Sequence, residues 1–162
     1  MPMTFHLMMK TFPDIPNQSG NPVFSISNVC NLEISVPESR YEEVLKTVET
    51  QENVRFQEIE LVYVDEKEIV RINKKYLKKE YITDIITFRY NEKKLQAIEG
   101  TLFCCLPRIK EQSKELGVDE SLEFLRIFIH GLLHLAGYDD QTKDQKNIMT
   151  QKENKILELI QS

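Results

Sequence analysis

The stretch SLEFLRIFIHGLLHLA, residues 121–136, carries apolar side chains on almost every side of a predicted helix. A helix of this kind is normally buried in the middle of a domain, so we expect the rest of the chain to pack around it. Asp119 is placed to cap its first turn, and Glu120 lies near its positive N-terminal end. Gly137 is placed to end it in a left-handed backbone conformation.

Upstream of this helix, β-branched and aromatic runs alternate with amphipathic helical patterns. The runs predict strands at 23–28, 54–65, 82–90 and 100–106. Apolar residues at helical spacing predict further helices that begin near 35–38 and lie at 66–79, 107–116 and 143–160. The segment NEKKLQAIEG, which follows the third strand, is predicted to be a charged connection. Strands mixed with helices, then a run of helices, indicate an α+β or mixed α/β domain built on one sheet.

The chain has 162 residues, 41% of them hydrophobic, which is long enough to bury one core and short for two domains. Residues 1–22 hold four of the six prolines and no periodic apolar face, so we expect a disordered extension before one domain at 23–162. No run reaches the roughly 18 apolar residues of a membrane span, and no signal peptide is evident. We therefore expect a cytoplasmic protein without a membrane partner. Cys104 and Cys105 are adjacent and are expected to be reduced packing residues.

His130 and His134 lie four positions apart on the predicted helix, so both imidazoles can be directed at one point. Gly137 lets the chain turn back, which brings Asp140 toward the two histidines. Two imidazoles and one carboxylate leave a fourth tetrahedral position for water, as in a catalytic zinc site. Gly131 removes bulk beside the first ligand, where another chain segment or a substrate can approach closely. The alternative is a pair of hydrogen-bonded core or surface histidines without a metal.

The stretch HGLLHLAGYDD, residues 130–140, resembles the signature of the YbeY family of bacterial metal-dependent endoribonucleases, which act in ribosomal RNA maturation and ribosome quality control. It matches every specified position of H-G-x-L-H-L-x-G-Y-D-H except the last. A second stretch, INKKYLKKEYITDIITF at 72–88, is similar to the family's second block. The resemblance implies an α+β fold, in which a single mixed β-sheet is flanked by helices and a central buried helix carries HxxxH.

The resemblance also implies an activity. We expect a zinc-dependent hydrolase, a single-strand-specific endoribonuclease that acts with the ribosome on ribosomal RNA, at the 3′ end of the 16S molecule. One Zn²⁺ per chain is expected, held by His130, His134 and Asp140, with a zinc-bound water that attacks phosphorus. No general base is assigned, and the oligomeric state is left open.

Three positions depart from the family's pattern. The family's third zinc-binding histidine corresponds to Asp140, which still ligates but makes the site less positive and its bound water less acidic. An arginine to which RNA binding or catalysis is attributed corresponds to Leu77, and an aspartate corresponds to Thr101. Leu77 favours an alternative function, a non-catalytic ribosome-associated RNA-binding module with a structural metal.

Positive charge gathers in RINKKYLKK, which holds five cations in nine residues. Because the net charge of −5 repels RNA overall, a nucleic-acid role needs such a local patch. We expect Lys75, Lys78, Lys79 and Arg89 to contact the phosphate backbone. The alternative is a solvated, lysine-rich helix face.

Other residues bear on the kind of site. Asp84 is expected either to accept a hydrogen bond from a metal-bound imidazole or to be plain turn structure. A metalloprotease motif, H-E-x-x-H, would place its general-base glutamate where this chain has Gly131, which counts against proteolysis. His6 lies in the N-terminal extension and is excluded as a ligand.

Overall fold

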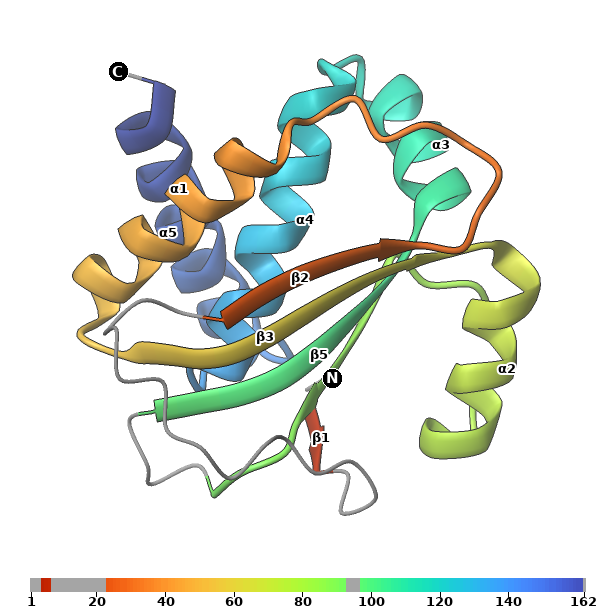
Figure 1. Cartoon of the computed structure of the whole chain (residues 1–162), viewed down its shortest axis with the longest axis horizontal. Coiled ribbons are helices and arrows are strands. Elements are labelled where there is room, and N and C mark those ends of the chain that lie inside the picture. Colours follow the sequence, from red (N-terminus) through yellow and green to blue (C-terminus); the bar gives the residue numbers. More distant parts are fainter. Residues whose placement is uncertain (1–3, 7–22, 93–96, 162) are drawn as a thin grey trace.

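The computed structural model describes residues 4–6, 23–92 and 97–161, which form an α+β domain on one five-stranded mixed sheet (Figure 1). The strands are β1 (Thr4–His6), β2 (Val23–Asn28), β3 (Arg55–Val64), β4 (Ile85–Arg89) and β5 (Ala97–Cys105). Their order across the sheet is β1-β4-β5-β3-β2, and only β4 and β5 are antiparallel neighbours among these described strands. The predicted fold class is confirmed.

Helices cover both faces of the sheet. One apolar cluster joins the sheet to α1 (Glu38–Glu52), α3 (Leu106–Leu116), α4 (Glu120–Leu135) and α5 (Lys143–Gln161). A second, smaller cluster joins the opposite face to α2 (Glu66–Leu77). Figure 1 accordingly shows α2 apart from the layer formed by α1, α4 and α5.

Two segments differ from the sequence prediction. β5 begins at Ala97, inside the predicted charged connection, because Ile98 is buried and pairs with Phe56 of β3. Thr4–His6, which fall in the predicted disordered extension, pair in parallel with β4 as a short strand at the sheet edge. A three-residue edge strand is held mainly by backbone hydrogen bonds, and a side-chain pattern does not reveal these. Residues 7–22 of that extension lie outside the described part of the chain.

Helix α4 is the centre of the domain, as its apolar surface predicts. It contacts α1, α3 and α5 on its sides and the strands β4 and β5 beneath. The Asp119 carboxylate caps it by accepting from the backbone N–H groups of Ser121 at 2.9 Å and Leu122 at 3.3 Å. The capping prediction is therefore confirmed.

Two glycines allow α4 to lie directly on the sheet. A Cβ at Gly131 would stand 2.3 Å from Leu102 and 2.5 Å from Ile85, both buried strand residues. A Cβ on Gly100 of β5 would stand 2.7 Å from the backbone oxygen of Phe88 and 3.0 Å from Leu135. The close approach to Gly131 expected from the sequence is therefore made by strand side chains of the sheet.

The cysteines agree with a further expectation. Cys104 and Cys105 are free, buried and packed into the two different apolar clusters, since neighbouring strand residues point to opposite faces. Within the described residues, every helix is too short or too polar to cross a membrane.

Gly100→Ala is expected to lower the free energy of unfolding by about 1–3 kcal/mol, because the added methyl group overpacks against a backbone carbonyl that cannot move aside. At an uncrowded strand position the same change would stabilise by roughly 0.5–1 kcal/mol. Urea denaturation measures the sign. Ser27→Ala, at an exposed position of β2, is the control and should stay within about 0.5 kcal/mol of wild type. Stabilisation by Gly100→Ala would contradict the close approach of Phe88 and Leu135 to Gly100.

Candidate metal centre

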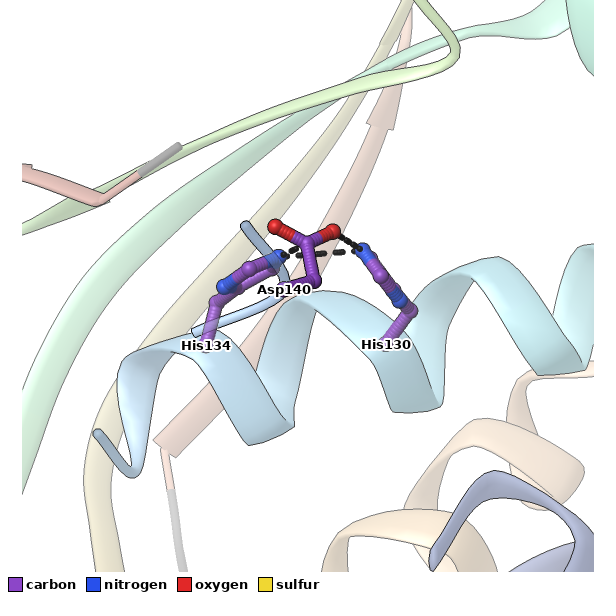
Figure 2. A group of neighbouring side chains, drawn as sticks. All are labelled: His130, His134 and Asp140. Carbon is purple, nitrogen blue, oxygen red and sulfur yellow. Dashed lines mark hydrogen bonds and ion pairs between the residues drawn. The ribbon is translucent and has the colours of Figure 1, made fainter. Parts of the chain in front are cut away.

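Two histidines one helical turn apart form the base of the site. His130 and His134 project from the same face of α4, and their Nε2 atoms stand 3.0 Å apart (Figure 2). The His134 side chain is fully buried, whereas 21% of the His130 side chain is exposed. The pair therefore presents two nitrogen atoms to one point at the edge of the core.

Asp140 comes back over this pair through the turn that ends α4. Gly137 has a φ of 113°, a region that favours glycine, and its N–H donates to the His134 carbonyl at 3.0 Å. The next N–H, of Tyr138, donates to the Leu133 carbonyl at 3.0 Å, which completes a Schellman ending. Asp140 Oδ2 then lies 3.3 Å from His130 Nε2 and 3.4 Å from His134 Nε2. The chain reversal expected from the sequence is present.

The three atoms form a nearly equilateral triangle with sides of 3.0, 3.3 and 3.4 Å. Ligands about 2.1 Å from a tetrahedral zinc ion stand about 3.4 Å from one another, so the triangle has the dimensions of three such ligands. Among the described residues, His130, His134 and Asp140 are the group of histidine, cysteine and acidic side chains that could hold a metal ion.

Hydrogen bonds on the far side of each ring set the tautomers. His134 Nδ1 lies 2.8 Å from the carbonyl oxygen of Tyr138, which can only accept, so this nitrogen carries the proton. His130 Nδ1 lies 2.7 Å from the Glu153 carboxylate, which accepts in the same way. When both imidazoles are neutral, each Nε2 has a lone pair on the side of Asp140, so a cation between the three ligand atoms can replace the proton that His130 otherwise carries there.

The pKa shifts in this group also indicate that it favours one positive charge among its three polar atoms. Burial disfavours a charged His130, yet hydrogen bonds and charge from Asp140 and Glu153 outweigh it and raise the pKa of His130 to about 9. Burial and the neighbouring His130 lower the pKa of His134. Burial raises the pKa of Asp140, but the His130 hydrogen bond and both imidazoles hold it below its ordinary range.

The loop that carries Asp140 is fixed by its tyrosine. The Tyr138 hydroxyl donates to Glu52 at the end of α1, and Lys152 of α5 binds the same carboxylate at 3.0 Å. The Lys152 ammonium also lies 4.6 Å from the centre of the Tyr138 ring. Contacts with two helices therefore hold the turn, and with it the third candidate ligand.

A pocket of about 340 Å³ opens beside this group. Its lining includes His130 and Asp140, together with residues of α3, α4, α5 and the loop before β4. Gln112 joins two acidic side chains of the wall, because its Nε2 donates to Glu123 at 3.0 Å and to Asp84 at 3.3 Å. The pocket therefore adjoins two of the three candidate ligands.

Of the two interpretations left open for Asp84, the structure does not support that of an imidazole acceptor, although Asp84 lines the pocket. Its carboxylate accepts from Gln112, and the imidazole partner of His130 is Glu153. The sequence did not single out Glu153. A signal was present, because this carboxylate interrupts the apolar stripe of α5, which consists of Met149, Ile156, Leu157 and Ile160.

The predicted RNA-binding cations are not gathered at the pocket. Lys75, Lys78 and Lys79 lie on or directly after α2, on the opposite face of the sheet from α4, and none of them lines the pocket. Arg89 requires a correction, because it is only 3% exposed. Its guanidinium donates to backbone oxygens of Leu135 and Glu92, so it anchors the end of α4 and is not a surface cation.

The two other departures from the family's pattern are packing residues here. Leu77 is partly buried against the apolar cluster beneath α2. Thr101 is fully buried, and its hydroxyl accepts from Tyr90 at 2.8 Å.

Comparison with known proteins gives consistent matches. The family described as "Endoribonuclease YbeY" matches residues 27–161. A protein named Endoribonuclease YbeY from Chlorobium limicola is 45% identical over 96 residues, which are 59% of this chain and 65% of that protein. The protein of that name from Chlorobaculum tepidum is 36% identical over 76% of this chain and 88% of its own. The one from Bacteroides thetaiotaomicron is 35% identical over 71% and 82%.

A solved structure shares the fold. The solution structure of TM1509 from Thermotoga maritima superposes with a TM-score of 0.58 and covers 85% of this chain and 89% of that one. The two sequences are 24% identical in the superposition, so this likeness concerns the fold alone.

Asp140→Ala is expected to release a bound metal ion, because two imidazoles alone hold zinc weakly. Asp140→His should retain it, since a neutral third ligand replaces the carboxylate. Asp139→Ala is the control and should behave like wild type, because Asp139 is outside the ligand group. Metal titration of the three purified variants tests the assignment. Release from Asp139→Ala with retention in Asp140→Ala would show that the ligand is the wrong aspartate.

Glu153→Gln is expected to weaken metal affinity about 10- to 100-fold, because the carboxylate that orients His130 and increases its basicity is lost. Glu158→Gln, an exposed change on the same helix, serves as the matched control. Competition with a chromogenic chelator measures both affinities. Equal affinities in the two variants would mean that Glu153 has no part in holding the ligand.

Proposed function

The chain belongs to the YbeY endoribonuclease family, and from this premise we propose that it is a zinc-dependent endoribonuclease. Its substrate is single-stranded ribosomal RNA, at the 3′ end of the 16S molecule, and it acts in ribosomal RNA maturation and ribosome quality control. The observation that carries the proposal is the triangle of ligand atoms with sides of 3.0, 3.3 and 3.4 Å at the wall of an open pocket.

In this proposal His130, His134 and Asp140 hold one Zn²⁺ per chain. The bound ion supplies Lewis acidity toward a phosphodiester oxygen and lowers the pKa of a water molecule. Glu153 and the Tyr138 carbonyl hold the two imidazoles in the tautomer that ligates through Nε2. Asp140 brings a negative charge where the family has a neutral histidine, so the site is less positive and its water less acidic.

The open side of the ligand group favours catalysis over a structural metal. A structural zinc site is closed by four protein ligands, whereas this group has three and adjoins a pocket of about 340 Å³. The alternative is a ribosome-associated RNA-binding module with a structural metal. Whether bound RNA is cleaved distinguishes this module from the enzyme.

The lysines on and directly after α2 are given a role outside the pocket. Lys75, Lys78 and Lys79 are proposed to attract the RNA backbone to the opposite face of the sheet, as part of a cytoplasmic encounter with the ribosome. Arg89 is no longer included, because it is buried.

The purified protein is expected to cleave a single-stranded transcript that contains the 3′ end of precursor 16S ribosomal RNA. Cleavage should stop on treatment with a chelator, return when zinc is added, and be absent in His134→Ala, which removes a buried ligand. Gel electrophoresis of end-labelled RNA measures the products. The same sequence annealed into a duplex should remain intact.

Asp139→Ala provides the control for this assay and should cleave at the wild-type rate. Binding of the transcript without cleavage, at any zinc concentration, would support the non-catalytic module in place of the enzyme. Cleavage unaffected by complete removal of metal would contradict the metal centre.

A further inference from the structure

Arg126 lies in the same row of α4 as the two histidines. It precedes His130 by four residues, as His130 precedes His134, so the three side chains follow one face of the helix at intervals of about one turn. Arg126 lines the pocket beside the metal site and also the adjoining depression of about 290 Å³ between α4 and α5. A guanidinium therefore stands where the two hollows meet.

The acidity of the pocket makes the position of Arg126 significant. The described lining residues include four carboxylates, those of Asp84, Glu123, Asp140 and Glu153. Besides His130, the cationic or titratable basic side chains in that lining are Arg126 and Lys146. A phosphodiester is an anion, so it enters an acidic pocket of this kind only where a cation offsets the repulsion.

Arg126 is held in place and still has donors to offer. Its Nη1 donates to Glu153 at 3.1 Å and its Nη2 to Asn154 at 2.8 Å. A guanidinium has five N–H groups, so these two bonds use only part of its donor capacity. Its side chain is 33% exposed, which leaves the group accessible from the pocket.

Glu153 links this guanidinium to the metal site. One of its carboxylate oxygens accepts from Arg126 and the other from His130 Nδ1 at 2.7 Å. The position of the positive charge relative to the candidate ligand is therefore fixed before any substrate arrives. Preorganised charge of this kind stabilises developing negative charge without reorganisation during the reaction.

We propose that Arg126 binds a backbone phosphate of the RNA beside the metal centre, as a substrate-contacting residue of the active site. This inference rests on the proposed function and adds a residue to it. Leu77, where the YbeY family has an arginine, is packed against the apolar cluster beneath α2. Arg126 offers a guanidinium to the pocket from a different element of the fold.

The test measures how salt weakens RNA binding. For single strands, the slope of log affinity against log salt is about −0.7 for each phosphate contacted by a cation. Fluorescence anisotropy with a short labelled single-stranded oligoribonucleotide is recorded over about 50–200 mM salt, on the full chain with zinc and after chelation. We expect Arg126→Gln to bind roughly 10- to 100-fold more weakly and to show a slope smaller in magnitude by about 0.7. Arg126→Lys, which keeps the charge, should keep the slope.

Arg40→Gln is the matched control. Arg40 is 32% exposed, forms an ion pair with Glu43 and donates to the Ile160 carbonyl of α5, but it lines neither pocket. Its substitution should leave the slope unchanged. A second measurement uses RNA in which single phosphates are replaced in turn by neutral methylphosphonates. One replacement should weaken wild-type binding but have no further effect on Arg126→Gln.

An unchanged salt slope in Arg126→Gln, with affinity or cleavage reduced, would overturn the inference, because the residue would then act only through Glu153. Additive losses at every methylphosphonate position would overturn it as well. If wild-type protein fails to bind the RNA, the proposed function falls and this inference with it. If wild type binds and cleaves but Arg126→Gln is unaltered, the inference alone is wrong.

Discussion

The close contact of α4 with the sheet is the constraint on which the rest of the structure depends. Gly100 and Gly131 carry no side chain where helix and strands approach, so α4 lies directly on β4 and β5 and is enclosed by α1, α3 and α5. The helix is buried on almost all sides, and the imidazoles of His130 and His134 emerge along the one row that reaches an edge of the core. Any movement of α4 away from the sheet would shift both candidate ligands together.

Burial also requires each polar atom of this row to have a partner. A buried imidazole N–H without an acceptor costs about 1–3 kcal/mol, and here each Nδ1 has an acceptor from a later part of the chain. His134 uses the carbonyl of Tyr138, in the turn after α4, and His130 uses Glu153 of α5. The candidate ligand group is therefore complete only when α5 has packed against α4, which couples its geometry to the packing of this C-terminal helix.

The departures from the family's pattern fit one another physically. Asp140 adds a negative charge to the ligand group, and the pocket wall is already acidic. Leu77 packs into an apolar cluster and supplies no charge. A guanidinium on α4, bound to Glu153, is one of the cations in this acidic wall.

The sequence by itself determined the features that depend on residues a few positions apart. It determined α4, the pairing of His130 with His134 through the helical repeat, and the turn at Gly137 that returns Asp140, because backbone geometry links neighbours within one or two turns. Only the tertiary structure decided that Glu153 meets His130 and that the predicted phosphate-binding Arg89 is buried. Those contacts join segments up to 46 residues apart along the chain. The periodicity of a helix or strand shows which of its faces is apolar. Which residue lies opposite a given side chain depends on how the elements pack together.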